Sequence, residues 1–189
     1  MVSLMELWLP ILVSAVLVFV VSSIIHMVLQ THKDDCRRLP GEEKMLTELR
    51  AQGIPRGHYA FPHPGSMKNM CSPEMLEKYR EGPVGYLIVM PNGPPAIGKN
   101  LVQWFLHSIA VGVLVAYVAG VAIPRGSDFM IVFRVAGTAG ILGYAMGHLV
   151  DSIWMGHPWS NTIKHFLDGV VYGLVTGAAF ALLWPAVST

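Results

Sequence analysis

The sequence has little charge and little cysteine. Only 13% of its 189 residues are charged and 53% are hydrophobic, whereas soluble domains usually carry about 25% charged residues. The formal net charge of +1 gives no basis for binding nucleic acid. Two cysteines, Cys36 and Cys71, are too few for a disulfide scaffold. These shortages argue against a disulfide-stabilised secreted domain and favour a membrane protein.

The few charged residues are concentrated in the middle of the chain. Every Lys and Arg lies between positions 33 and 99 except Arg125, Arg134 and Lys164. Each apolar stretch outside this segment is long enough to cross a hydrocarbon core about 30 Å thick as a helix. These stretches lie at 4–29, 101–123, 129–154 and 162–184. The first is longer than the roughly 7–15 apolar residues of a signal peptide, so we expect a retained membrane helix.

The polar segment carries signals for a small α+β unit. Acidic residues open an amphipathic pattern at 42–53, which predicts a short helix. Ser72 followed by Pro73 predicts the start of a second helix, which should stop before Gly82. An apolar, β-branched run at 84–90 predicts a strand that pairs with residues around Tyr59 as a hairpin.

The predicted fold is therefore an all-α membrane protein of four transmembrane helices, with a small α+β cytoplasmic cap between helices 1 and 2. Helix 1 is expected at 1–29, the cap at 30–99 and helices 2–4 at 100–189. The positive-inside rule places the cap in the cytoplasm, because basic residues flank it. These residues are Lys33, Arg37, Arg38 and Lys99.

Small residues recur at every fourth position in the last three apolar stretches. They are Gly112, Ala116 and Gly120, then Gly143 and Gly147, then Gly169, Gly173 and Gly177. Such ridges let helix backbones approach closely in lipid, so we expect these three helices to form a tight core with the first at its periphery. Asp151 continues the second ridge and His165 begins the third. Antiparallel packing of the two ridges would pair Asp151 with His165.

His and Asp occur three residues apart on both sides of the turn at 154–161, and further histidines lie near the same predicted end of the bundle. Imidazole and carboxylate groups are typical ligands of transition metals. The candidate metal-binding residues are His148, Asp151, His165, Asp168, His107 and His26. The same groups could instead form structural His–Asp pairs or, because histidine titrates near neutral pH, a proton or ion path.

Three stretches of the last hundred or so residues carry a resemblance to a known group of proteins. They are Gly156-His-Pro-Trp-Ser-Asn-Thr-Ile-Lys164, Asp168-Gly-Val-Val-Tyr-Gly173 and Pro83-Val-Gly-Tyr-Leu-Ile-Val-Met-Pro91. In these the chain resembles small uncharacterised inner-membrane proteins of bacteria. The resemblance implies a bacterial inner membrane and a four-helix architecture, and it brings no assigned activity.

The sequence contains no phosphate loop, no zinc-protease motif and no dinucleotide-binding fingerprint. The leading expectation is a structural or accessory membrane subunit, whose partners are the lipid bilayer and other membrane subunits or copies of itself. The first alternative is a metal-binding membrane enzyme or carrier with a His/Asp site at the cytoplasmic ends of helices 3 and 4. The second alternative is a proton-coupled transporter.

Overall fold

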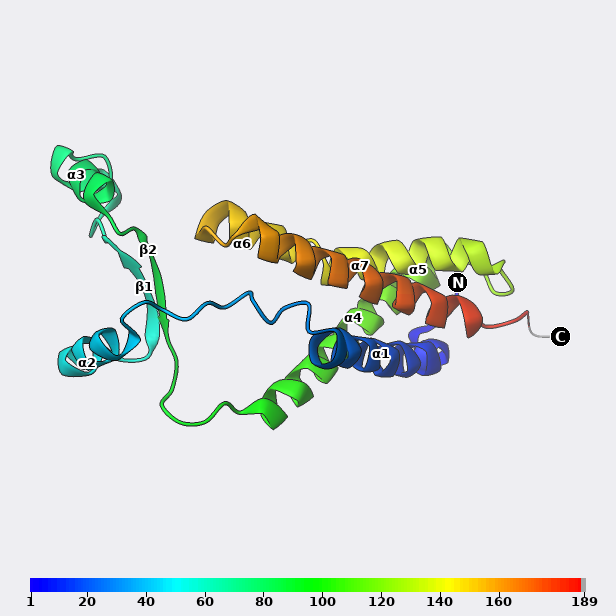
Figure 1. The fold of residues 1–189 in the computed structure, drawn as a ribbon. Helices are drawn as coiled ribbons and strands as arrows, with labels where there is room; N and C mark the ends of the chain where they lie inside the picture. Colours follow the sequence, from blue (N-terminus) through cyan, green and yellow to red (C-terminus); the bar gives the residue numbers. More distant parts are fainter. Residues whose placement is uncertain (188–189) are drawn as a thin grey trace. The chain divides into compact units, whose positions relative to one another are not determined.

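The structure is a computed structural model that describes residues 1–187, and it divides into two compact units. One unit joins Met1–Cys36 to the chain from Ala96 onward, and the other is Arg37–Pro95. The first unit contains the long helices, and the second contains short helices and two strands (Figure 1). Residues 30–36 and 96–99, which the sequence predicts as part of the cap, belong to the helical unit.

Within residues 1–187, four helical stretches are long and apolar enough to cross a membrane, as the sequence predicts. They are Leu4–Leu29, Ile97–Ala122, Phe129–Met155 and Trp159–Leu182. The first consists of η1 (Leu4–Leu7), α1 (Trp8–Ser23) and the π-helical turn η2 (Ile24–Leu29). The second is α4 (Ile97–Ala122), and the fourth is α7 (Trp159–Leu182).

The third stretch is not one continuous helix. It consists of α5 (Phe129–Tyr144) and α6 (Gly147–Met155), with Ala145 and Met146 in a turn between them. Glycines at positions 143 and 147 flank this turn, and glycine is a poor helix former because it loses much backbone freedom on folding. The break lies close to His148, at the start of α6.

The first helix does not lie at the periphery of a three-helix core. The ridge of α4 packs against α1 instead: a Cβ built on Gly112 would lie 3.3 Å from Ile11, and one built on Gly120 would lie 2.6 Å from the Val2 carbonyl oxygen. α1 also packs against α7. At the end of the bundle where α1 begins, Arg125 donates a hydrogen bond to Glu6.

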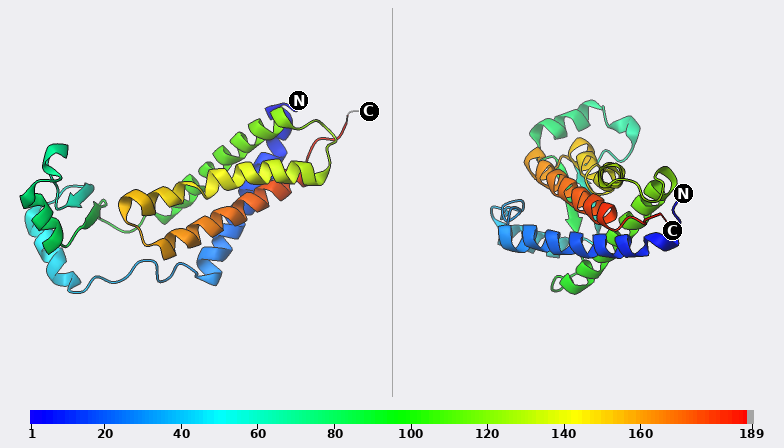
Figure 2. Two further views of the ribbon diagram at one scale, coloured as in Figure 1. Left: turned by 90° about the horizontal axis from the view of Figure 1, so that it is seen from above. Right: turned by 90° about the vertical axis from the view of Figure 1, so that its right-hand side faces the viewer.

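α5 and α7 form the closest helix pair, and both views show them side by side (Figures 1 and 2). Their backbones touch at glycines: a Cβ on Gly177 would lie 2.7 Å from Gly137 Cα, and one on Gly140 would lie 3.0 Å from Gly173 Cα. The predicted register of the third stretch is therefore wrong. Gly143 packs against Val111 of α4, and a Cβ on Gly147 would meet nothing within 4 Å.

The second unit contains the elements that the polar segment predicts. α2 (Glu42–Gln52) ends at Gly53 in a left-handed conformation, and α3 (Pro73–Glu81) begins with the Ser72 hydroxyl accepting the Met75 N–H. β1 (Gly57–Phe61) and β2 (Gly85–Val89) pair antiparallel, with Tyr59 opposite Leu87. A short η3 (Met67–Asn69) lies between β1 and α3.

Candidate metal centre

A reversal of the chain after the first helix brings polar residues back against the bundle. The helix ends in η2, and Gln30 then adopts a left-handed conformation with φ of 51°. A left-handed residue is a common helix terminator, although glycine usually takes this position. Turns follow at once, with Lys33 N–H donating to Gln30 O and Asp35 N–H donating to His32 O. We call residues 31–36 the return loop.

His32 of the return loop lies between two carboxylates. Its Nδ1 lies 2.6 Å from Asp35 Oδ2, and its Nε2 lies 2.7 Å from Asp168 Oδ2 on α7. All three side chains are largely buried, with exposed fractions of 12%, 11% and 15% for His32, Asp35 and Asp168. Buried ionisable groups need such partners, because desolvation without compensation is costly.

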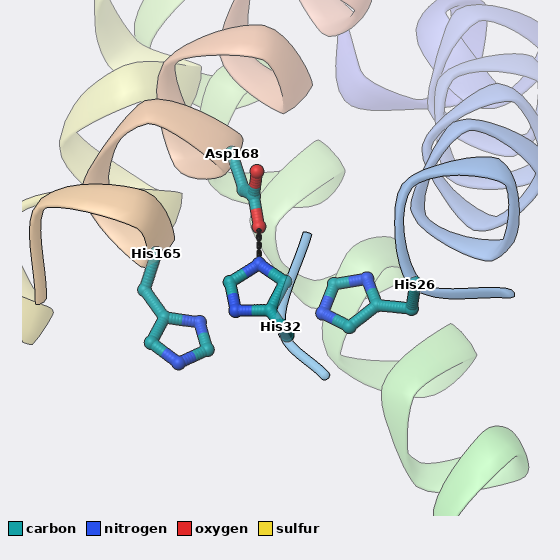
Figure 3. Close-up of side chains that lie close together, drawn as sticks. All are labelled: His26, His32, His165 and Asp168. Atoms are coloured by element: carbon teal, nitrogen blue, oxygen red, sulfur yellow. Dashed lines mark hydrogen bonds and ion pairs between the residues drawn. The ribbon is translucent and has the colours of Figure 1, made fainter. Parts of the chain in front are cut away.

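Four imidazole rings are stacked through this region. The His32 ring lies between those of His26 and His165, with centroid distances of 4.7 Å and 4.5 Å and interplanar angles of 6° and 20°. The His148 ring continues the stack, with its centroid 5.3 Å from that of His165. Figure 3 shows the first three rings side by side, with the Asp168 carboxylate facing the His32 ring.

Three of these histidines, together with Asp168, form a candidate metal-binding cluster. His26, His32, His165 and Asp168 each offer one ligand atom, and the four atoms lie within 4.8 Å of one another. Two of the rings also have a hydrogen-bond partner on Nδ1. Nδ1 of His26 lies 2.9 Å from the Ser22 carbonyl oxygen, and Nδ1 of His32 is hydrogen-bonded to Asp35. Metal-binding histidines usually have such a partner on the second nitrogen, which fixes the ring and leaves Nε2 for the metal.

Lys164 balances part of the negative charge. Its ammonium donates to Asp35 Oδ1 at 2.6 Å and to the Thr31 carbonyl oxygen at 3.0 Å. The hydrogen bond from Lys164, assisted by that from His32, holds the pKa of the Asp35 carboxyl below its usual value. Asn161 donates to the Asp35 carbonyl oxygen at 3.0 Å. The return loop is thus attached to α7 at several points.

Two cavities adjoin the cluster. The first has a volume of about 350 Å³ and is lined by three of the four cluster residues, His26, His165 and Asp168. The second has a volume of about 310 Å³ and is lined by Asp35, His148 and Asp151 among others. Because His148 and His165 line both cavities, their stacked rings stand between the two.

The structure brings together some of the predicted site residues and not others. His26, His165 and Asp168 lie in the cluster, and His148 stacks on its edge. His107 is exposed and stacks on Trp104, outside the cluster. Asp151 is exposed and, in the described chain, makes no ion pair with His165. That expected pairing is wrong because the face of Gly143 and Gly147 is not the face of the third stretch that packs on α7.

Sequence reasoning missed His32, the central residue of the cluster. A signal for it was present, since His32 and Asp35 repeat the three-residue spacing of His148–Asp151 and His165–Asp168. Both residues fall within the segment 30–99 that the sequence assigns to the cap. Only the reversal at Gln30 shows that this loop returns to the helices.

Comparison with known protein families, characterised proteins and solved structures finds no match to this chain. The resemblance to small bacterial inner-membrane proteins therefore stays a prediction. Any function has to be argued from the chemistry of the cluster and its cavities.

Proposed function

We propose that this chain is an integral membrane protein that binds one divalent transition-metal ion through His26, His32, His165 and Asp168. The observation that carries the proposal is the convergence of four ligand atoms within 4.8 Å. It is strengthened by the Nδ1 partners of two rings, Ser22 O and Asp35. Metal-binding histidines usually have such a partner on the second ring nitrogen.

The chemistry of the ligands limits which metal ions the site would bind. Three imidazoles with one carboxylate suit zinc and neighbouring divalent ions such as cobalt, nickel, iron and manganese, and they are unlike the all-oxygen sites of magnesium or calcium. Completing the site would require the stacked rings to turn so that their nitrogen lone pairs meet at one point, and the ligand atoms to move closer together, because Zn–N and Zn–O bonds are about 2.0–2.2 Å long. His32 would exchange its hydrogen bond with Asp168 for a shared metal ion.

The location of the protein forms part of the proposal. The four apolar helices of 24 to 27 residues support a multi-pass membrane protein. We assign it to the bacterial inner membrane from the sequence resemblance, and we place the metal site at the cytoplasmic side. Basic residues near the ends of the polar segment support this orientation. They are Lys33, Arg37, Arg38 and Lys99.

The test is metal binding by the full chain purified in detergent. Cobalt is added to metal-depleted protein and followed by its visible absorption, with elemental analysis of the zinc-loaded form. We expect about one ion per chain in the wild type and none in the double variant His26→Ala/His165→Ala. Asp35→Asn should weaken binding roughly 10- to 100-fold, as expected for a residue that orients a ligand.

The matched control is His58→Gln, which removes an imidazole from β1 in the other unit and should leave binding unchanged. The proposal is wrong if the folded wild type binds none of zinc, cobalt or nickel above the level of the double variant. It is equally wrong if the control loses as much metal as the double variant.

A second candidate is the structural or accessory subunit. One observation favours it: both ring nitrogens of His32 already have carboxylate partners, so the network can hold the return loop on α7 without an ion. In that case the wild type binds no metal, and His32→Ala lowers the thermal stability of the protein without any change in metal content. Partner proteins would then be sought by cross-linking in the membrane.

A further inference from the structure

The larger cavity beside the cluster has a polar end and an apolar body. His26, His165 and Asp168 contribute the polar groups, while Met27 and Leu101 contribute aliphatic surface. Its volume of about 350 Å³ lies at the lower end of the range for small-molecule sites. Since its walls come from α1, η2, α4, α6 and α7, it belongs wholly to the helical unit.

One wall of the cavity is fixed by a hydrogen bond within the protein. Trp104 lines the cavity, and its indole N–H donates to Ser22 Oγ at 2.9 Å. Its ring also packs against Tyr172, with centroids 5.7 Å apart. The Tyr172 hydroxyl is buried and has no hydrogen-bond partner among the described residues. A buried polar group of this kind usually reflects a bound water or ligand that supplies the missing bond.

The net charge of the metal-loaded site would favour a ligand whose head group carries a negative charge. Asp35 and Asp168 supply two negative charges, which a divalent ion would neutralise, and Lys164 supplies a further positive charge. With neutral imidazoles, one net positive charge remains. An ion held by His26, His165 and Asp168 also lies at the cavity, because these three residues line it. A monoanionic oxygen ligand can therefore approach the metal from the cavity.

We propose that this cavity binds an aliphatic amphiphile with an anionic oxygen head, such as a single-chain carboxylate from the bilayer. The head binds the metal ion as a fifth ligand beside the four side chains, and the chain lies against Met27, Leu101 and Trp104. This inference rests on the proposed metal site and adds the class of molecule on which that site acts. It also explains why a site built from polar groups adjoins an apolar cavity inside membrane-spanning helices.

The test compares two carboxylates that differ only in chain length. Octanoate and acetate are titrated into the cobalt-loaded wild type in detergent, and the visible absorption of the cobalt reports binding of the head. We expect octanoate to half-saturate the site at roughly a tenth or less of the acetate concentration, because each buried methylene adds to the affinity. Equal half-saturation by the two probes overturns the inference.

Two variants that fill the cavity from different helices provide the second arm. Leu101→Trp on α4 and Ser23→Phe on α1 should remove the preference for octanoate over acetate. The matched control is Val102→Trp, an equally bulky change at an exposed neighbour that does not line the cavity. It should keep the wild-type preference. An octanoate preference that survives in both filled variants also overturns the inference, since the gain would then come from the detergent micelle.

The outcomes separate the two proposals. If the wild type binds none of zinc, cobalt or nickel, the proposed metal site is wrong and the cavity inference falls with it. If cobalt binds but chain length has no effect, only the cavity inference is overturned.

Discussion

Replacing Gly173 by alanine should strongly destabilise the packing of α5 on α7. The new Cβ would overlap the backbone nitrogen of Ile141 and would lie 2.8 Å from its Cα. These are backbone atoms, so they cannot rotate away as the end of a side chain can. The two helices would have to move apart, and contacts along the whole glycine seam would loosen together.

The magnitude follows from the size of the overlap. Ordinary contacts of a Cβ begin at 3.4 Å, so the backbones must separate by about 1 Å at this point. Overpacking a close-packed interior costs typically 1–3 kcal/mol. We expect Gly173→Ala to reach the upper end, about 3 kcal/mol, because its neighbours are backbone atoms on a facing helix.

Two other glycines of the same region provide graded controls. A Cβ at Gly143 would lie 2.9 Å from a methyl group of Val111, a side chain that can adjust, so the expected cost is about 1 kcal/mol. A Cβ at Gly147 would meet nothing within 4 Å. Gly147→Ala should therefore leave stability about unchanged, because the new methyl group meets no atom and Gly147 is the first residue of α6, outside the helix interior where the Gly–Ala difference applies in full.

The assay is reversible unfolding of each variant in mixed micelles, followed by helix content. We expect the order Gly147→Ala, Gly143→Ala, Gly173→Ala from most to least stable. A Gly173→Ala variant within about 0.5 kcal/mol of Gly147→Ala, the range typical of neutral surface changes, would refute the close backbone contact between α5 and α7.

Two further predictions concern the return loop in the metal-free protein. Because Lys164 and His32 lower the pKa of Asp35, its ionised form stabilises the fold above the unfolded carboxylate pKa of about 3.9. The difference in melting temperature between wild type and Asp35→Asn should shrink as acid lowers the pH through the folded pKa of Asp35; a difference that grows in acid contradicts this. In double-mutant cycles on thermal stability, Asp35→Asn with Lys164→Met should show coupling of about 1 kcal/mol. Asp151→Asn with His165→Ala should show none, and the reverse ranking would restore the pairing that the glycine spacing suggested.

The elements themselves were predictable because each has a local cause. Apolar length predicts the four long helices, and the Ser72–Pro73 start and Gly53 end of the short helices follow from capping chemistry. The strand β2 follows from its apolar, β-branched residues, and it pairs antiparallel with β1 around Tyr59 as expected, although η3 and α3 lie between the two strands where a hairpin would have a short turn. All these signals lie within a few residues of the feature they predict.

The register of the helices was not predictable in the same way. The third stretch has small residues on more than one face: Gly137 and Gly140 meet α7, while Gly143 meets α4. Four-residue spacing identifies a face that permits close approach, but it does not say which of two such faces a given partner uses. The choice depends on the full packing of the neighbouring helices, including the break at Ala145 and Met146.

The candidate site was only half predictable for a related reason. His165 and Asp168 lie on one face of one helix, which the sequence shows directly. His32 joins them because Gln30, a residue other than glycine, adopts the left-handed conformation that reverses the chain. Nothing in the local pattern indicates that reversal.

The two attachments of α7 differ in kind, and this difference bears on function. Its contact with α5 is made by backbone atoms at glycines and leaves little room for movement. Its contact with the end of the first helix and the return loop is made instead by ionisable side chains, among them His32, Asp35 and Lys164. A ligand that binds only the assembled cluster stabilises that second contact in proportion to the logarithm of its concentration. Metal binding would therefore strengthen the attachment of the return loop to α7. The contact between α5 and α7 would not change and would hold α7 in place.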